Sequence, residues 1–145
     1  MVDLIEYMFY YNNRTFVRKE RPSDPKNVSL SFFSEIIMDE YKIIAVDFDG
    51  TLCYSNWPDL GEPNVRLIEY LKSFRETGNK LILWTCRAGE ALERAVSWCR
   101  EQELEFDAIN DNLPEIVALY GNNSRKITCD YYIDDRACLP DEVNF

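Results

Sequence analysis

The chain has 145 residues, of which 46% are hydrophobic and 14% aromatic, a composition that supports a folded core and excludes extensive disorder. Its 26 acidic and 16 basic residues give a net charge of −10, which opposes non-specific binding to DNA or RNA. The N-terminus lacks a basic start followed by a long apolar run, so we expect neither a signal peptide nor a membrane span.

The cysteine and histidine content restricts the chemistry that the chain can perform. The five cysteines are scattered without a Cys-x-x-Cys pair, so we expect free thiols and a reducing, cytoplasmic location rather than a disulfide framework or a zinc site. The sequence contains no histidine. Proton transfer near neutral pH would therefore use carboxylates, lysine, cysteine, tyrosine or bound water.

Residues 1–40 differ in character from the rest of the chain. They combine an aromatic stretch, a basic segment over Arg14–Lys26 with five basic and two acidic residues, and a pattern compatible with a short helix over Ser29–Glu40. We therefore divide the chain into an N-terminal extension, 1–40, and a main domain, 41–145. Three roles remain open for the extension. It could be a packing layer or linker, it could form the contact of a homo-oligomer, or it could act as a partial lid.

From residue 41 the chain alternates between strand and helix patterns. Pro63 suits the first turn of a helix, and Gly78 suits the position just after its C-terminus. The alternation predicts an α/β fold with a mainly parallel, three-layer, Rossmann-like core. The predicted strands are 42–48, 80–84, 106–109 and 126–133, the last made irregular by Asp130, and the predicted helices are 63–77, 91–99 and 113–120.

Polar residues stand at the ends of the predicted strands, where open α/β sheets bind their ligands. Carboxylates are good ligands for Mg²⁺, which is often shared with a substrate phosphate. A hydroxyl, a lysine and four carboxylates at one edge are therefore typical of a magnesium and phosphate site rather than of a core. The polar residues at the strand ends are Asp47 and Asp49 after the first strand, Thr85 and Arg87 after the second, Asn110 after the third, and Lys126 before and Asp134 and Asp135 after the fourth.

The order of these residues resembles that of the haloacid dehalogenase (HAD) superfamily, whose members are mostly Mg²⁺-dependent phosphohydrolases. The string Asp47-Phe48-Asp49-Gly50-Thr51-Leu52 is similar to the family's Asp-x-Asp signature. Thr85, Lys126 and the pair Asp134-Asp135 follow in the family's order, and each matches the residue type of its motif. The resemblance covers about residues 41–140 but not 1–40, and the stretches 84–87, 106–110 and 132–136 also resemble a group of small, cap-less HAD hydrolases.

The resemblance implies a role for each residue of the motifs. Asp47 would be the nucleophile that forms an aspartyl-phosphate, and Asp49 would act as general acid and base. The implied cofactor is Mg²⁺, which offsets the repulsion between the nucleophile and the phosphate. Its ligands would be Asp47, the backbone carbonyl of Asp49 and Asp134, with Asp135 placing a metal-bound water. The substrate phosphate would contact Thr85, Lys126 and backbone N–H groups around Gly50 and Thr51.

Several of these residues have a second interpretation. Arg125 competes with Lys126 for the phosphate, and a lone Thr85 is more typical of a helix N-cap. Arg87 would either contact the leaving group of the substrate or form a surface ion pair. Asn110 is either a substrate contact or a turn former. The sequence leaves these alternatives open.

The gaps between the motifs are too short for the cap domain that many HAD enzymes carry. Eleven positions, 52–62, precede the first helix, and fifteen, 111–125, precede Lys126. The site would therefore be open, and the loop around Trp57 would either cover it or simply pack. An open site admits macromolecules such as phosphoproteins or polynucleotide ends, although the 19 acidic and 11 basic residues of 41–145 disfavour nucleic acid.

We therefore expect a Mg²⁺-dependent phosphomonoester hydrolase whose substrate is a phosphorylated small molecule. A phosphatase of a macromolecule is the alternative within this class. From another class, a non-catalytic phosphate- or metal-binding module or a phosphoacceptor remains open, although receiver-type phosphoacceptors carry their acidic pair on the first strand. A haloacid dehalogenase proper lacks the second aspartate of the signature, which is present here as Asp49.

Overall fold

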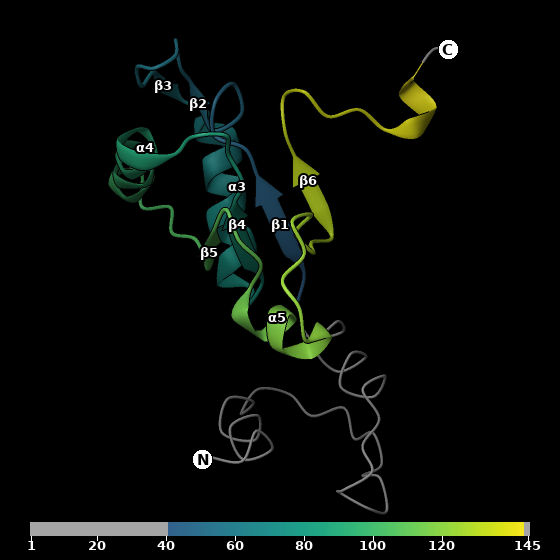
Figure 1. Cartoon of the computed structure of the whole chain (residues 1–145). Coiled ribbons are helices and arrows are strands. Elements are labelled where there is room, and N and C mark those ends of the chain that lie inside the picture. Colours follow the sequence, from purple (N-terminus) through teal and green to yellow (C-terminus); the bar gives the residue numbers. More distant parts are fainter. Residues whose placement is uncertain (1–40, 144–145) are drawn as a thin grey trace, which may run out of the picture.

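Residues 41–143 are described by the structure, a computed structural model, and the N-terminal extension 1–40 lies outside the described residues. Residues 41–143 form a four-stranded sheet and a short two-stranded hairpin. Figure 1 shows helices packed around the sheet and the hairpin at one end. The sheet contains β1 (Ile43–Val46), β4 (Lys80–Leu83), β5 (Ala108–Ile109) and β6 (Tyr131–Ile133), and the hairpin contains β2 (Cys53–Tyr54) and β3 (Glu62–Pro63). The helices are α3 (Val65–Glu76), α4 (Gly89–Glu101), α5 (Pro114–Tyr120) and the 3-10 helix η1 (Pro140–Glu142).

The sheet has the strand order β5–β4–β1–β6, and every pair of neighbours is parallel. Parallel strands need crossover connections, and α3, α4 and α5 each lie on one of the three connections of this sheet. The predicted α/β fold with a mainly parallel sheet is thus confirmed, and it is compatible with a Rossmann-like arrangement. Within residues 41–143 no cap domain occurs.

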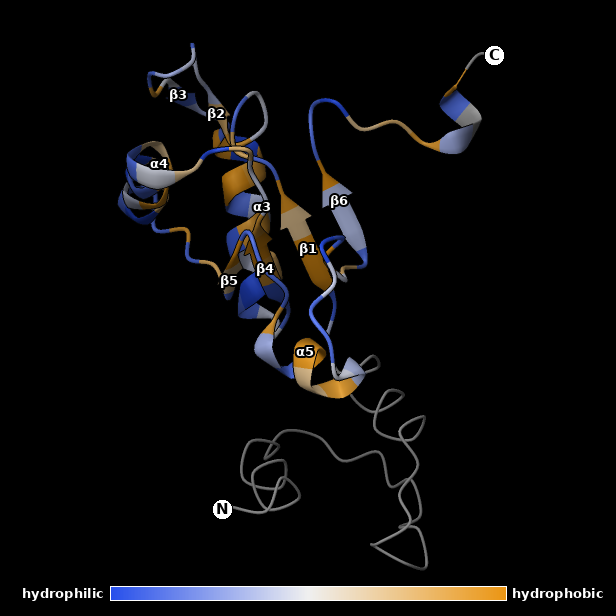
Figure 2. Cartoon of the chain, viewed as in Figure 1, coloured by the Kyte–Doolittle hydropathy of each residue, from blue (hydrophilic) through white to orange (hydrophobic). Residues whose placement is uncertain are grey.

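The sheet is the middle one of three layers. Ile44 and Val46 of β1 pack into one core, and Ile43 and Ala45 pack into a second core, as the two-residue period of a strand requires. Figure 2 shows that β1 is apolar along its length, whereas α3 and α4 combine hydrophilic and hydrophobic residues. The first core also contains Ile68 and Leu71 of α3 and Ala95, Trp98 and Cys99 of α4, and the second contains Leu113, Ile116 of α5, and Ile127.

The helix predicted to begin at Pro63 begins two residues later, at Val65. Pro63 instead belongs to β3, where it pairs with β2 in the antiparallel hairpin. The helix starts after Asn64 because the side chain of Asn64 accepts the N–H of Leu67 at 3.3 Å and so caps the helix. Asn64 also donates to the carbonyl of Thr51 at 3.0 Å, which ties α3 to the turn after β1.

Two predicted strands are shorter in the structure. The strand predicted over 126–133 is reduced to β6, because Asp130 enters the pairing through its side chain. Its carboxylate accepts the N–H of Ile43 at 2.7 Å, where a regular strand would offer a backbone carbonyl. The strand predicted over 106–109 begins only at Ala108, again directly after an aspartate. The remaining predicted elements agree with the structure to within two residues at each end.

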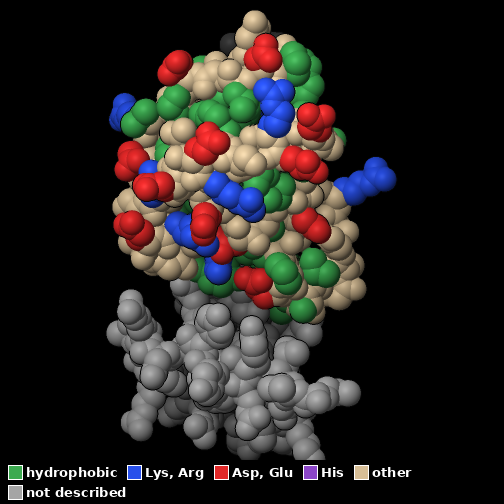
Figure 3. All heavy atoms as spheres, turned by 90° about the vertical axis from the view of Figure 1, so that its left-hand side faces the viewer, with side chains coloured by type: hydrophobic (Ala, Val, Ile, Leu, Met, Phe, Trp, Pro, Cys, Tyr) green, Lys and Arg blue, Asp and Glu red, His purple; other side chains and the backbone are tan. Residues whose placement is uncertain are grey.

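The outer surface of the described residues carries both signs of charge. Figure 3 shows acidic and basic side chains interspersed with apolar ones on the face that it displays, so that face has no broad patch of a single charge. Of the helices between residues 41 and 143, none combines the length and apolarity that crossing a membrane requires.

Candidate functional site

Three carboxylates meet at the carboxyl edge of the sheet, and we call them the acidic cluster. Asp47 follows β1 directly, and Asp134 and Asp135 follow β6, its parallel neighbour. The N–H of Asp47 donates to the carbonyl of Ile133 at 2.9 Å, so the two strands stay paired up to the point where the acids leave the sheet. One carboxylate oxygen from each acid lies within 4.8 Å of the other two. This spacing suits a single shared cation.

A tight turn after β1 brings the backbone close to the acidic cluster. The carbonyl of Phe48 accepts the N–H groups of Leu52 and Cys53 at 3.0 and 2.9 Å. Gly50 lies in this turn with a φ of 78°, in the left-handed region that favours glycine. A Cβ atom on Gly50 would lie 2.5 Å from Oδ2 of Asp135, so a larger residue would displace that carboxylate.

Thr51 connects two members of the acidic cluster. Its hydroxyl donates to Oδ2 of Asp47 at 3.3 Å and accepts the backbone N–H of Asp135 at 3.0 Å. Thr51 is 6% exposed. The structure therefore gives Thr51, which the sequence placed among the substrate contacts, a part in holding the two acidic segments together.

The acidic cluster concentrates negative charge around Asp47. The pKa of Asp47 is raised from 3.8 to about 6, first because burial disfavours its charged form and then because Asp134 and Asp135 repel it. The N–H of Phe48 and the hydroxyl of Thr51 act in the opposite direction. A bound cation relieves such repulsion, so the electrostatics and the geometry favour the same kind of ligand.

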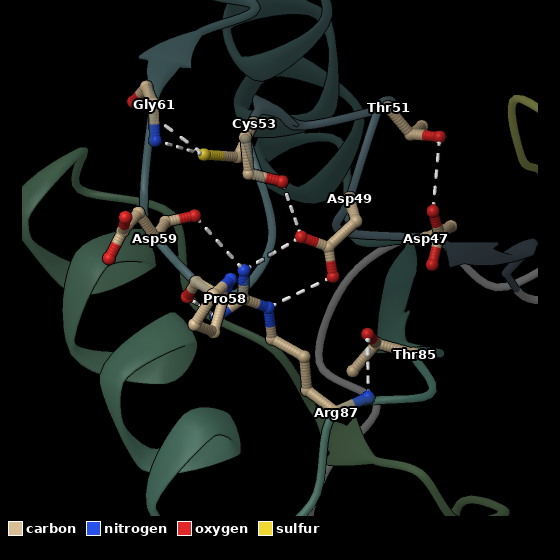
Figure 4. A network of polar contacts seen from close by, with 10 residues as sticks. Asp47, Asp49, Thr51, Cys53, Pro58, Asp59, Gly61, Thr85 and Arg87 are labelled. Atoms are coloured by element: carbon tan, nitrogen blue, oxygen red, sulfur yellow. Dashed lines mark hydrogen bonds and ion pairs between the residues drawn. The ribbon is translucent and has the colours of Figure 1, made fainter.

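Asp49 lies two residues after Asp47 but pairs with Arg87 (Figure 4). Nε and Nη2 of Arg87 donate to Oδ2 and Oδ1 of Asp49 at 2.9 and 2.7 Å. The hydroxyl of Ser55 also donates to Oδ1 of Asp49. The carboxylate of Asp49 is therefore held in a bidentate ion pair and is not one of the clustered carboxylates. The backbone carbonyl of Asp49 takes no part in this ion pair, so the pairing does not bear on its expected role as a metal ligand.

Arg87 is buried, which differs from both interpretations of the sequence. A substrate contact and a surface ion pair each require an exposed guanidinium, whereas Arg87 is 1% exposed. Its guanidinium carbon lies 4.9 Å from the ring centroids of both Phe48 and Trp57. Nη1 donates to the carbonyl of Pro58 at 3.3 Å. Arg87 thus joins the loop between β2 and β3 to Asp49.

The surroundings of Asp49 favour its ionised form. Burial raises the pKa of Asp49, but the hydrogen bonds from Arg87 and Ser55 and the charge of Arg87 outweigh this effect, so the pKa lies below its usual value. The role of a general acid requires a carboxyl group that is protonated for part of the reaction. The ionised form instead suits the other half of that role, the acceptance of a proton from water.

Thr85 and Asn110 link the ends of β4 and β5. Oδ1 of Asn110 accepts the N–H of Thr85 at 2.8 Å, and Nδ2 donates to the carbonyl of Arg87 at 3.3 Å. The hydroxyl of Thr85 accepts the N–H of Arg87 at 3.2 Å, whereas the N-cap of α4 is Ala88. Asn110 has a φ of 51°, as a turn former does. Both residues thus hold the backbone at the edge where the acidic cluster lies.

Lys126 and Arg125 lie on the exposed segment between α5 and β6. The carbonyl of Lys126 accepts the hydroxyl of Ser124 at 2.8 Å. Within residues 41–143, the ion pairs of the structure join neither Lys126 nor Arg125 to the acidic cluster. The structure thus brings the first and last motifs together, whereas Lys126 forms no ion pair with them among the described residues.

Sequence reasoning missed the partners of Asp49 on the loop between β2 and β3. Ser55 carries no sequence signal that would single it out, since an isolated serine is common in loops. Trp57 was assigned to a loop that either covers the site or packs. In the structure its ring lies over Arg87 while 62% of the residue stays exposed, so it packs on one side and faces solvent on the other.

The fold and the site define an α/β protein with a parallel sheet and three clustered carboxylates at its carboxyl edge. The solved structure of a conserved protein encoded at a locus of Bacteroides thetaiotaomicron is similar to this chain, with 42% sequence identity and a TM-score of 0.60. The similarity covers 67% of this chain and 78% of the other. The chain therefore belongs to the same family as that conserved protein. No family model and no curated protein matches the chain.

Proposed function

We propose that this protein is a phosphomonoester hydrolase of the HAD type, which requires Mg²⁺ and uses Asp47 as its nucleophile. The observation that carries the proposal is the acidic cluster at the carboxyl edge of the sheet, where one oxygen of each carboxylate lies within 4.8 Å of the others. The resemblance of the ordered motifs, from Asp47 through Thr85 and Lys126 to the acidic pair, supports the same conclusion.

The acidic cluster fits Mg²⁺ on the chemistry of its donors. Mg²⁺ prefers hard oxygen ligands and takes one or two carboxylates together with substrate phosphate. The turn at Gly50 leaves the carboxylate of Asp135 space that a Cβ atom would fill. We assign the ion to Asp47, Asp134 and the backbone carbonyl of Asp49, with Asp135 completing the set. When bound, the ion offsets the negative charges of the nucleophile and the phosphate.

The first half of the reaction transfers the phosphoryl group to the protein. A carboxylate oxygen of Asp47 attacks phosphorus, a new O–P bond forms, and the P–O bond to the alcohol breaks. The departing alcohol oxygen receives its proton from Asp49. Thr85, Lys126 and the N–H groups of the turn at Gly50 are the groups of this chain that would bind the phosphoryl oxygens.

The second half of the reaction releases phosphate. A water molecule gives a proton to the ionised Asp49 and attacks phosphorus, and the O–P bond to Asp47 breaks. The products are inorganic phosphate and the Asp47 carboxylate, and Asp49 is protonated again for the next turnover. The ion pair with Arg87 favours the form of Asp49 that this half of the reaction requires.

The test is phosphate release from p-nitrophenyl phosphate with Mg²⁺, with and without EDTA. We expect activity in the wild type that EDTA abolishes and that Asp47→Asn reduces by at least about 10³-fold, since covalent catalysis depends on the nucleophile. Asp111→Asn is the matched control, because Asp111 is an exposed carboxylate that follows β5 at the same edge of the sheet. Equal activity in the wild type and Asp47→Asn would overturn the proposal, as would an inactive wild type across a broad panel of phosphate esters.

The same panel defines the substrate class. No cap domain encloses the site within the described residues, so its access is set by the loop between β2 and β3. We propose a phosphorylated small molecule, because the net charge of −10 disfavours a polyanion. Higher kcat/KM on phosphopeptides or on phosphorylated oligonucleotide ends than on sugar and nucleoside monophosphates would replace this choice with a macromolecular substrate.

A further inference from the structure

Arg87 and Asp49 differ in their access to solvent although they form one ion pair. The side chain of Arg87 is 0% exposed, whereas that of Asp49 is 32% exposed. Solvent can therefore reach the side chain of Asp49 but not the guanidinium of Arg87. Any effect of Arg87 on a bound substrate must pass through Asp49 or through the loop that covers Arg87.

Four hydrogen bonds fix the guanidinium of Arg87. Two go to the carboxylate of Asp49 and two go to the loop between β2 and β3, where the carbonyls of Pro58 and Asp59 accept at 3.3 and 3.4 Å. The stacking contacts with Phe48 and Trp57 add to these bonds. Figure 4 shows Arg87 between Asp49 and the loop residues Pro58 and Asp59. A planar fork that bonds on both sides leaves Asp49 one orientation.

The hydrogen bonds also leave one part of Asp49 available. An ionised carboxylate has about four acceptor positions, two on each oxygen. Oδ1 accepts from both Arg87 and Ser55, whereas Oδ2 accepts from Arg87 alone among the described residues. The open acceptor position of Asp49 is therefore on Oδ2.

We propose that Arg87 is a positioning residue: it fixes the orientation of the Asp49 carboxylate, two residues after Asp47, so that Oδ2 keeps an open acceptor position for the reacting groups, and it ties the loop between β2 and β3 in place beside it. The catalytic part of this inference rests on the function proposed above. Arg87 is not a substrate contact, and its loss acts on turnover through Asp49.

The first test is a double-mutant cycle on p-nitrophenyl phosphate hydrolysis with Arg87→Met, Asp49→Asn and the double variant. A misplaced catalytic group costs on the order of 10²-fold, so we expect Arg87→Met to lower kcat about 100-fold and to leave KM within about twofold. In the Asp49→Asn background the same change should have no further effect. If the losses of kcat in the two single variants multiply in the double variant, the inference is overturned. A raised KM with an unchanged kcat in Arg87→Met also overturns it, because a direct substrate contact would give that result.

Two further variants control for folding and for charge. Arg87→Lys keeps a buried cation opposite Asp49 but cannot bond the carboxylate through two parallel donors. If Arg87→Met does not fold, Arg87→Lys takes its place in the double-mutant cycle. We expect Arg87→Lys to lower kcat at least about 10-fold and to be non-additive with Asp49→Asn. Arg100→Met changes an exposed arginine on helix α4, which begins two residues after Arg87, and it should leave kcat, KM and loop exchange unchanged.

The second test does not depend on phosphatase activity. The N–H of Asp59 bonds to the carbonyl of Asn56 at 3.0 Å, and the N–H of Gly61 bonds to Sγ of Cys53 at 3.1 Å. Hydrogen exchange of these two amides should be at least about 10-fold faster in Arg87→Lys than in the wild type. Unchanged exchange overturns the positioning role even if the enzyme is active. If the wild type is inactive, the proposed function fails and faster exchange still supports the placement of the loop by Arg87.

Discussion

The N–H of Leu81 donates to Oδ2 of Asp107 at 2.9 Å, and the N–H of Asp107 donates to the carbonyl of Leu81 at 2.8 Å. Asp107 thereby joins β5 to β4 with a carboxylate as one of the acceptors. Asp130 joins β6 to β1 in the same way, through bonds of 2.7 and 2.9 Å to Ile43. Both outer strands of the sheet thus begin directly after an aspartate that fixes their register.

We expect Asp107→Asn to lower the free energy of unfolding by about 1–3 kcal/mol at pH 7. The change removes a charged acceptor from Leu81 and ion pairs with Lys80 and Arg75, at 3.2 and 3.5 Å. The side chain of Asp107 is only 14% exposed, so solvent screens these interactions weakly. Urea unfolding measures the difference, with Glu76→Gln, an exposed change on α3, as a control that should stay within about 0.5 kcal/mol.

The contribution of Asp107 to stability should depend on pH. Burial raises the pKa of Asp107, but the N–H of Leu81 and the charges of Lys80 and Arg75 outweigh it, so the pKa lies below 3.8. A carboxylate with a lowered pKa in the folded state adds stability that is complete above its unfolded pKa and is lost as the pH falls through the folded pKa. The difference between wild type and Asp107→Asn should therefore be constant above about pH 5 and shrink below about pH 4. A difference that widens on acidification would contradict this assignment.

Gly50→Ala should disturb the carboxylates of the acidic cluster in addition to straining the backbone. Gly50 and Gly121 have similar positive φ angles, 78° and 68°, but a Cβ atom would collide with Asp135 only at Gly50. We expect each alanine variant to lose about 1–2 kcal/mol of stability from the left-handed conformation. Only Gly50→Ala should also lose Mg²⁺ binding, measured by isothermal titration calorimetry. Equal Mg²⁺ affinity in the two variants would show that the close approach to Asp135 is unimportant.

Mg²⁺ affinity should separate the two kinds of aspartate at this edge. Asp134→Asn removes a member of the acidic cluster and should weaken Mg²⁺ binding at least about 10-fold. Asp49→Asn should leave the affinity within about threefold, because its carboxylate is bound to Arg87 and only its backbone carbonyl is proposed as a ligand. Calorimetric titration of both variants provides the comparison. Equal losses would mean that the Asp49 carboxylate leaves Arg87 to bind the ion.

Two apolar residues of α3 should differ sharply when they are changed to alanine. Leu71 is 0% exposed and packs in the first core, so Leu71→Ala should cost about 2–5 kcal/mol. Val65, the first residue of α3, is 60% exposed, and Val65→Ala should cost less than about 0.5 kcal/mol. Urea unfolding of the two variants tests whether α3 buries the face that the structure assigns to it.

The order of the strands and helices could be predicted because their patterns are local. The apolar run that precedes Asp47 predicts an interior strand, and the spacing of apolar residues in α3 and α4 predicts helices. The ends of the strands were less predictable where a side chain takes the place of a backbone hydrogen-bond acceptor, as the carboxylates of Asp107 and Asp130 do. Pro63 was misplaced because proline suits both a strand end and a first helical turn, and only the cap at Asn64 distinguishes them.

The acidic residues of the candidate site could be predicted from the sequence, but the residues that they bond to could not. Asp47 and the pair Asp134-Asp135 follow strands, and strand ends of a parallel sheet share one edge. The pairing of Asp49 with Arg87 joins residues 38 positions apart and depends on a loop whose path no periodic pattern sets. Lys126 was chosen by residue type, and residue type does not determine where an exposed loop carries a side chain.

The acidic cluster combines position 47, near the start of the described sheet, with positions 134 and 135, after its final strand. Pairing of β6 with β1 closes a long chain segment, and contacts of such high sequence separation form at a high entropic cost. A folding intermediate that has paired β1, β4 and β5 alone has no complete cation site. A divalent cation that binds the cluster therefore selects the fully assembled sheet, and it should slow the detachment of β6 in proportion to its occupancy.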